Sequence, residues 1–333
     1  MAVPQVITYS PAFTLVPTYE CFNRCTYCNF RTDSGQSPWL TLEAAAAQLS
    51  ALRQSGIVEI LVLSGEVHPR STRRRDWFER IYQICELALS MGFLPHTNAG
   101  PLSYDEMARL RQVNVSMGLM LEQTTPRLQE TVHRNAPSKD PALRLQQLEW
   151  AGELKIPFTT GLLLGLGETQ AERRSSLKAI AAAHLRWGHI QEAILQPYSP
   201  GQQEQWAGPG FELDQMAALV AIARELLPDD ITLQIPPNLV RSPQHLRDCL
   251  EAGARDLGGL VPRDHVNPDY AHATLDRLAE HLDPKTWRLQ PRLPVYPAFD
   301  EWLPASVQDR VKCWRARLEA GYTGPITAIM QTT

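Results

Sequence analysis

The chain has 333 residues, 44% of them hydrophobic, and a formal net charge of -4, which is enough apolar material for one large domain or two modest ones. A nucleic-acid surface needs a dense basic face, and no stretch approaches the roughly 20 apolar residues that span a bilayer, so we expect neither nucleic acid nor a membrane as a partner. The N-terminus lacks the basic and apolar parts of a leader, and the sequence therefore predicts a cytoplasmic protein acting on a small-molecule substrate.

Short apolar runs with strand character alternate along the chain with longer segments of helical period. Capping boxes at Ser103/Glu106 and Thr169/Glu172, and prolines at the first helical positions after Asp140 and Ser242, mark four helix starts. Repeated strand-then-helix units imply parallel strands joined by right-handed crossovers. The expected strands are 14–20, 59–65, 94–98, 115–121, 158–165, 192–198 and 232–237.

This pattern suits either a closed barrel or an open doubly wound sheet, and we favour the barrel. A Rossmann sheet would carry G-x-G-x-x-G after its first strand, where this chain has a cysteine loop. We therefore predict an α/β protein with a partial TIM-type (β/α)6 barrel core over residues 1–240. The pattern loosens afterwards, so residues 241–333 are expected to form a C-terminal extension that closes or covers the barrel. Functional groups of such barrels lie at the carboxyl ends of the strands.

The loop after the first expected strand, "TYECFNRCTYCNFR" (18–31), carries the clearest chemical signal. Its C-x3-C-x2-C pattern is formed by Cys21, Cys25 and Cys28. Structural zinc sites are closed, with ligands that usually come in two close pairs, and no second pair exists here, although His68 and His96 are candidates to complete such a site. A [4Fe–4S] cluster with three protein ligands instead leaves one iron open for a substrate or cosubstrate. The sequence favours the cluster.

The C-x3-C-x-aromatic-C arrangement after the first barrel strand resembles the radical S-adenosylmethionine (SAM) superfamily. The resemblance implies that the three cysteines are both metal ligands and catalytic residues, and that the open iron chelates SAM. One electron from the reduced cluster then breaks a C–S bond of SAM, which gives methionine and a 5′-deoxyadenosyl radical. Tyr27 occupies the aromatic position expected to lie against the adenine of SAM.

Two further stretches support this resemblance. "LSGE" (63–66) resembles the Gly-Gly-Glu motif that receives the SAM amino group, with Ser64 in place of the first glycine. "GLLLGLGE" (161–168) resembles the G-x-I-x-G-x-x-E pattern near the adenine, although alone it reads as a buried strand ending in a glycine turn. Glu122 and Arg144 flank the fourth strand–helix unit and are candidates for SAM ribose and carboxylate contacts. The alternatives are an ordinary loop carboxylate for Glu122 and a surface helix charge for Arg144. The SAM contacts implied by these patterns are Tyr27, Ser64, Gly65, Glu66, Glu122, Arg144 and Gly165.

Phrases such as "LPHTNAGPLS" (94–103), "HRNAPSKDPALRL" (133–145) and "DHVNP" (264–268) narrow the match. Together they resemble the CofG-type subunits of 7,8-didemethyl-8-hydroxy-5-deazariboflavin (FO) synthase, over about residues 10–275. The resemblance implies a radical SAM lyase of deazaflavin coenzyme biosynthesis that closes the central ring of a 4-hydroxybenzyl–ribityluracil adduct and releases ammonia. It also implies a partner subunit that transfers the hydroxybenzyl group, and a one-electron donor such as ferredoxin or flavodoxin.

Polar residues at the remaining strand ends are the candidates for substrate contacts. They are His96, Thr97, Asn98, Gln196, Tyr198 and Asn238. His96 has a simpler alternative as a hydrogen-bonded packing residue. Three other functions stay open: the hydroxybenzyl-transferring partner, a menaquinone-pathway cyclase, and a non-catalytic zinc- or cluster-binding barrel. The "HAFSP"-like phrase usual in the first two relatives has no counterpart in this sequence.

Overall fold

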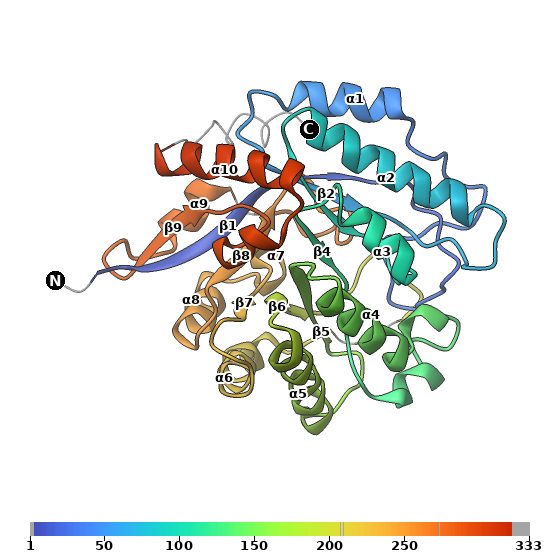
Figure 1. The fold of residues 1–333 in the computed structure, drawn as a ribbon. Helices are drawn as coiled ribbons and strands as arrows, with labels where there is room; N and C mark the ends of the chain where they lie inside the picture. The colour runs from blue at the N-terminus through green and yellow to red at the C-terminus, as the bar shows by residue number, and fades with distance from the viewer. Residues whose placement is uncertain (1–2, 207, 209, 273, 322–333) are drawn as a thin grey trace.

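The computed structural model describes residues 3–206, 208, 210–272 and 274–321. Its central feature is a closed barrel of eight parallel strands (Figure 1), in the order β2-β3-β4-β5-β6-β7-β8-β1, with β1 also pairing with β2. A ninth strand runs parallel to the start of β1. The strands are β1 (Gln5–Leu15), β2 (Glu59–Leu63), β3 (Leu94–Asn98), β4 (Ser116–Gly118), β5 (Phe158–Leu164), β6 (Ile190–Pro197), β7 (Thr232–Gln234), β8 (Asp256–Leu260) and β9 (Trp287–Pro291).

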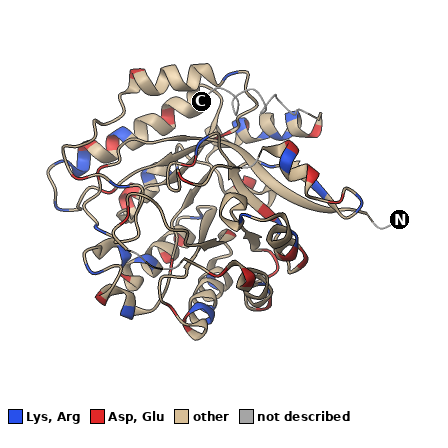
Figure 2. Ribbon diagram, turned by 180° about the vertical axis from the view of Figure 1, so that it is seen from behind, with Lys and Arg blue, Asp and Glu red and all other residues tan. Residues whose placement is uncertain are grey.

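Helices surround the barrel (Figure 1), and acidic and basic residues are mixed over this outer layer (Figure 2). No helix of the described residues has both the length and the apolar character needed to cross a membrane. The helices are α1 (Leu42–Ala51), α2 (Arg74–Ser90), α3 (Tyr104–Leu110), η1 (Pro126–Glu130), η2 (Pro137–Lys139), α4 (Pro141–Glu153), α5 (Gln170–Trp187), η3 (Leu213–Gln215), α6 (Met216–Leu226), α7 (Pro237–Val240), α8 (Pro243–Glu251), α9 (Leu275–Glu280), η4 (Pro297–Trp302) and α10 (Ala305–Glu319), where η marks a 3₁₀ helix.

The helix starts expected from the sequence are confirmed by the hydrogen bonds of the caps. Both capping boxes are complete: the Thr169 hydroxyl accepts from the N–H of Glu172, whose carboxylate accepts from the N–H of Thr169, and Ser103 and Glu106 do the same before α3. Such reciprocal bonds satisfy two N–H groups that the first helical turn leaves without partners. The α5 helix then stops at Gly188, whose φ of 68° is left-handed.

The expected barrel is confirmed, and it closes with two strands more than a six-unit core. The first strand also lies earlier than the 14–20 expected, at Gln5–Leu15. Pro17 has no N–H to donate to a strand ladder, and its carbonyl accepts from Leu40 N at 2.8 Å. The chain therefore leaves the sheet after Leu15 and enters the cysteine loop.

The C-terminal segment contributes both to the barrel and to its cover. Strand β8 lies in the barrel between β7 and β1. A second apolar cluster forms where the starts of β2, β3 and β4 pack against η4, α10 and the segment before η4. Its buried members are Val58, Leu94, Val115, Leu293, Val295, Phe299, Leu303, Val307, Val311 and Trp314. This cluster covers the amino-terminal end of the barrel, opposite the cysteine loop. The division of the chain at residue 240 stays a prediction.

Candidate active site

The cysteine loop follows β1 at the carboxyl end of the barrel and is fixed through its backbone. Arg24 N donates to Asn135 O at 2.7 Å, and Thr26 N donates to Val132 O at 3.1 Å. Phe22 N donates to the carbonyl of Glu66, just beyond β2, at 3.0 Å. Cys21, Cys25 and Cys28 line one cavity, which we call the first cavity. The loop is thus held independently of any group that its thiols bind.

The chemistry of the three thiols fits an iron–sulfur cluster better than a single metal ion. Burial raises the pKa of the Cys21 thiol to about 11 and that of Cys25 to about 12, so their thiolates need the positive charge of a metal. In the described part of the chain, no three His, Cys, Asp or Glu side chains are placed to hold one metal ion. Three thiols that do not converge on one metal position would instead hold an iron–sulfur cluster, for which cysteine thiolates are the usual ligands.

Neither of the two histidines considered for a zinc site lines the first cavity. His68 packs edge-on against Phe22, with ring centroids 4.9 Å apart, and its neighbour in the chain, Val67, is buried in the core. His96 lines a different cavity, inside the barrel. Neither the geometry of the thiols nor that of these histidines supports the zinc alternative.

Most of the residues expected to contact SAM surround the same first cavity. They are Tyr27, Ser64, Gly65, Glu66, Glu122 and Arg144. The Ser64 hydroxyl is already engaged, because it donates to Gly65 O at 2.8 Å and accepts from Trp77 Nε1 at 3.0 Å. Gly65 lies so close to the cysteine loop that a Cβ there would stand 2.3 Å from Glu20 O. The glycine of this motif therefore permits contact between β2 and the loop.

Glu66 presents an uncompensated carboxylate to the first cavity. Among the described residues, no hydrogen bond or ion pair reaches its side chain. The space it occupies depends on Gly100, whose φ is +75° and where a Cβ would stand 2.2 Å from Glu66 Cδ. Sequence reasoning missed Gly100, although it follows β3 in "NAGP" and marks a turn. A free carboxylate beside three thiols is suited to a ligand that carries an ammonium group.

Glu122 is the centre of a buried charge network that the sequence only partly predicted. Tyr27 donates its hydroxyl to Glu122 at 2.6 Å, Lys139 forms an ion pair with it, and Arg144 Nη1 lies 3.8 Å away. Burial opposes ionisation of Glu122, but the charges of Lys139 and Arg144 outweigh it and hold its pKa well below the usual value. His133 Nε2 is 3.3 Å from the same carboxylate. The phrase at 133–145 contained His133 and Lys139, but nothing local in it identified them.

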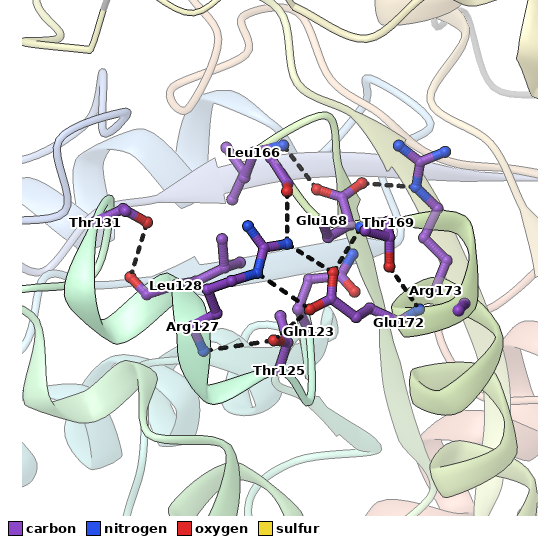
Figure 3. Close-up of polar contacts among 12 residues, drawn as sticks. Gln123, Thr125, Arg127, Leu128, Thr131, Leu166, Glu168, Thr169, Glu172 and Arg173 are labelled. Atoms are coloured by element: carbon purple, nitrogen blue, oxygen red, sulfur yellow. Dashed lines mark hydrogen bonds and ion pairs between the residues drawn. The ribbon is translucent and has the colours of Figure 1, made fainter.

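The loop after β5 is held by hydrogen bonds and ion pairs of two carboxylates, Glu168 and Glu172 (Figure 3). Glu168 accepts from the N–H groups of Gly165 and Leu166, both at 2.8 Å, and pairs with Arg173 at 2.7 Å. Arg127 bridges this loop to α5 by donating to Gly167 O and to Glu172, each at 2.8 Å. Gly165, expected at the adenine, forms the turn with φ +91°, and Leu163 supplies this strand's contribution to the first cavity.

The second cavity lies inside the barrel and adjoins the first. Asn98 and Gln196 line both cavities. His96 and Asn238 line the second cavity, whereas Tyr198 lines the first. His96, Asn98, Gln196, Tyr198 and Asn238, all expected to contact substrate, therefore line the two adjoining cavities.

Thr97 is the exception. Its hydroxyl donates to Asn114 Oδ1 at 2.8 Å and contacts Cys85 Sγ at 3.2 Å. Successive side chains of a strand point to opposite faces, so Thr97 faces the helices while its neighbours His96 and Asn98 face the cavities. His96 is a neutral imidazole, because burial lowers its pKa to about 3, and its Nδ1 bonds to Ser116 Oγ at 2.7 Å.

The lower part of the second cavity contains charged residues that sequence reasoning missed. Arg292 follows β9 and bonds Asp256 with Nε at 2.6 Å and Nη2 at 2.9 Å, and it pairs with Glu192. Glu59, Glu192, Gln234 and Arg292 line the cavity here, and we call them the cavity floor. Burial raises the pKa of Glu192 to about 7 and also raises that of Glu59. One guanidinium thus faces three carboxyl groups.

Comparison with known proteins agrees with this geometry. Residues 15–180 match the Radical SAM superfamily. The 7,8-didemethyl-8-hydroxy-5-deazariboflavin synthase of Trichormus variabilis is 62% identical over 93% of this chain and 91% of its own length. The synthase of the same name from Thermosynechococcus vestitus is 64% identical over 92% of this chain and 98% of its own length.

Solved structures agree with the fold. The FeFe-hydrogenase maturase HydG from Carboxydothermus hydrogenoformans has a TM-score of 0.71 at 19% identity, covering 98% of this chain and 81% of HydG. Methylornithine synthase (PylB) has a TM-score of 0.58 at 14% identity, covering 78% of this chain and 73% of its own. The barrel, its cysteine loop and the sequence match define a radical SAM enzyme, whose cofactors are a [4Fe–4S] cluster and SAM. Within that superfamily, the chain belongs to the family of 7,8-didemethyl-8-hydroxy-5-deazariboflavin synthases.

Proposed function

We propose that this chain closes the central ring of the deazaflavin chromophore. Its substrate is the 5-amino-5-(4-hydroxybenzyl)-6-(D-ribitylimino)-5,6-dihydrouracil adduct, and its products are FO, ammonia, 5′-deoxyadenosine and methionine. The names of relatives that are 62% and 64% identical over nearly the whole chain support the product. The observation that carries the proposal is the junction of the two cavities at Asn98 and Gln196, because a short-lived radical must meet its substrate beside the place where it forms.

The first cavity has a group for each part of SAM. Cys21, Cys25 and Cys28 would hold the cluster, which together with bound SAM would supply a 5′-deoxyadenosyl radical. Glu66 accepts the ammonium group of SAM, because its carboxylate has no other partner among the described residues. Arg144 faces the SAM carboxylate, while Tyr27 and Glu122, joined by their 2.6 Å hydrogen bond, face the adenosine portion.

The second cavity receives the adduct and protects the radical. A primary alkyl radical abstracts hydrogen from other donors unless the site excludes them. The barrel strands surround this cavity, and the cluster of η4 and α10 residues covers its amino-terminal end. His96, neutral at physiological pH, and Asn238 hold polar groups of the substrate without adding charge.

Two further proteins complete the proposed reaction in the cytoplasm. A hydroxybenzyl-transferring partner subunit joins a tyrosine-derived group to 5-amino-6-ribitylaminouracil and so supplies the adduct. A one-electron donor such as ferredoxin or flavodoxin reduces the cluster. We assign this chain one step because it has one C-x3-C-x2-C loop, whereas joining two substrates and closing a ring require differently shaped sites.

Replacing Glu66 is expected to weaken SAM binding. Loss of a hydrogen bond to a charged group costs about 1.5–3 kcal/mol, so Glu66→Gln should raise the SAM dissociation constant roughly 10- to 150-fold. Gly100→Ala should act in the same direction, because its methyl group would displace Glu66 Cδ from a position 2.2 Å away. Equilibrium dialysis with labelled SAM measures both effects. An unchanged dissociation constant in Glu66→Gln would remove Glu66 from the site.

An omission experiment tests the assignment to a single step. Tyrosine, 5-amino-6-ribitylaminouracil, SAM and a reductant are incubated with this chain, with the partner subunit, and with both. The expected result is fluorescent FO only when both proteins are present. Formation of FO by this chain alone would show that the single-step assignment is wrong. Formation of the adduct by this chain alone would instead identify it as the hydroxybenzyl transferase.

A further inference from the structure

Several polar groups that line the second cavity have no hydrogen-bond partner among the residues that the structure describes. The buried atoms Asn238 Oδ1 and His272 Nδ1 both lack a hydrogen bond among the described residues, and both residues line this cavity. The side-chain amides of Asn98, Gln196 and Gln234 also make no hydrogen bond to any residue that the structure describes. Buried polar groups are almost always paired in native proteins. The cavity is therefore built for a ligand with many hydrogen-bonding groups.

The position of the cavity floor shows which part of a ligand reaches it. Gln234 pairs in register with Asp256, and Glu192 lies below Ile194, which is the β6 partner of Gln234. Gln196, at the junction with the first cavity, stands one side-chain layer above Ile194 on the same strand. The atoms that react must lie at that junction. A substituent that takes no part in the reaction is therefore the part that extends down to the floor.

The charges of the cavity floor favour a neutral ligand that both donates and accepts hydrogen bonds. Arg292 forms its ion pairs with Glu192 and Asp256, and Glu59 adds a further buried carboxyl group beside them. Hydroxyl groups donate to carboxylates and accept from amides without adding charge. A phosphate ester would bring negative charge next to three carboxyl groups and one guanidinium in a low-dielectric interior, where repulsion is strong.

Gln234 is held in position to make such contacts. Its Nε2 lies 2.2 Å from where a Cβ of residue 258 would stand, so only a glycine with φ +75° leaves room for it. The amide thus reaches the cavity across Gly258 and adds one donor and one acceptor to the floor.

We propose that the cavity floor, Glu59, Glu192, Gln234 and Arg292, binds the ribityl chain of the substrate through its hydroxyl groups and rejects the corresponding 5′-phosphate ester. This specificity rests on the proposed function, because the ribityl chain belongs to the proposed adduct and remains in the product. The reacting rings then lie at Asn98 and Gln196, and the polyol chain extends away from the first cavity.

Equilibrium binding of the product to the SAM-loaded holoprotein tests this assignment without turnover. Three fluorescent ligands are titrated: FO, its analogue with a methyl group in place of the ribityl chain, and the 5′-phosphate ester of FO. Each hydrogen bond to the ribityl chain contributes a factor of about ten or less to the affinity, and the methyl analogue loses several of these bonds. The methyl analogue should therefore bind at least about tenfold more weakly than FO. The phosphate ester should bind more weakly than FO by a similar factor or more.

Two variants at the floor and one control above it locate the effect. Gln234→Leu and the nearly isosteric Glu59→Gln should each weaken FO binding about three- to tenfold and leave the methyl analogue unchanged. Gln196→Leu makes the same chemical change at the junction, and it should weaken both ligands by the same factor. Circular dichroism confirms that each of the three variants is folded.

The outcomes separate this inference from the proposed function. Equal binding of FO and the methyl analogue by the wild-type protein, or a phosphate ester that binds as well as FO, would overturn the role of the floor and leave the ring-closing function intact. Equal losses for both ligands in Gln234→Leu would do the same. If the wild-type protein cleaves SAM but binds none of the three ligands, both the inference and the proposed substrate are wrong.

Discussion

Replacing Cys25 by alanine is expected to abolish reductive SAM cleavage while leaving the fold intact. The loop around Cys25 is fixed by backbone hydrogen bonds from Arg24 and Thr26 to residues 135 and 132, and alanine preserves these bonds. The thiol itself lines the first cavity and belongs to none of the apolar core clusters of the described residues. Because a three-thiolate cluster cannot be retained by two, 5′-deoxyadenosine formation should fall below detection.

Iron and sulfide analysis after anaerobic reconstitution accompanies the activity measurement. The wild-type protein should contain about four irons with sulfide, and Cys25→Ala should lose most of them with an unchanged far-UV circular dichroism spectrum. The control is Cys313→Ala, at an exposed cysteine of α10 outside the loop, which should keep both cluster and cleavage. Cleavage retained by Cys25→Ala, or one zinc per wild-type chain, would refute the cluster assignment.

The second large effect concerns stability. Arg292→Met should lower the free energy of unfolding by about 3–5 kcal/mol, because removing one partner of a buried ion pair leaves the other charges uncompensated. The Arg292 side chain is only 10% exposed and pairs with Glu192 and Asp256. The control is Arg109→Met, which breaks a solvent-exposed pair with Glu79 and should cost about 1 kcal/mol or less. Denaturant midpoints of the holoproteins measure both.

The stability loss in Arg292→Met should depend on pH. Burial raises the pKa of Glu192 to about 7 in the folded protein, above its value of about 4.5 in an unfolded chain. The folded state therefore binds a proton that the unfolded state has released, and the stability linked to this group is present at acid pH and lost as pH rises through about 7. Removing the guanidinium raises this pKa further, so the variant should lose more stability at pH 8 than at pH 5.5. An equal loss at both pH values would contradict the role given to Glu192.

Local signals in the sequence predicted the parts of the structure that depend on local contacts. The capping boxes at Ser103 and Thr169 and the cysteine loop involve residues within a few positions of each other, so their chemistry is visible in short stretches. The alternation of side chains along a strand is also a local property, and it places His96 and Thr97 on opposite faces of β3. Which of the two faces the barrel interior depends on how β3 packs in the barrel. The sequence alone did not contain that choice.

The parts that could not be predicted depend on contacts between distant residues. Arg292 meets Glu192 from 100 positions away, and Tyr27 meets Glu122 from 95 positions away. Nothing near Arg292 distinguishes it from a solvated arginine, because its partners are brought to it only when the barrel closes. The same holds for Lys139, which the family phrase contained but whose pairing with Glu122 required the fold.

The most direct test of the account is the reaction of the isolated adduct. The reduced holoprotein is incubated anaerobically with SAM and the purified 4-hydroxybenzyl–ribityluracil adduct, and the products are identified by fluorescence and mass. The account predicts fluorescent FO together with ammonia, 5′-deoxyadenosine and methionine, and no FO from Cys25→Ala. Cleavage of SAM that leaves the adduct unchanged would contradict the proposed substrate.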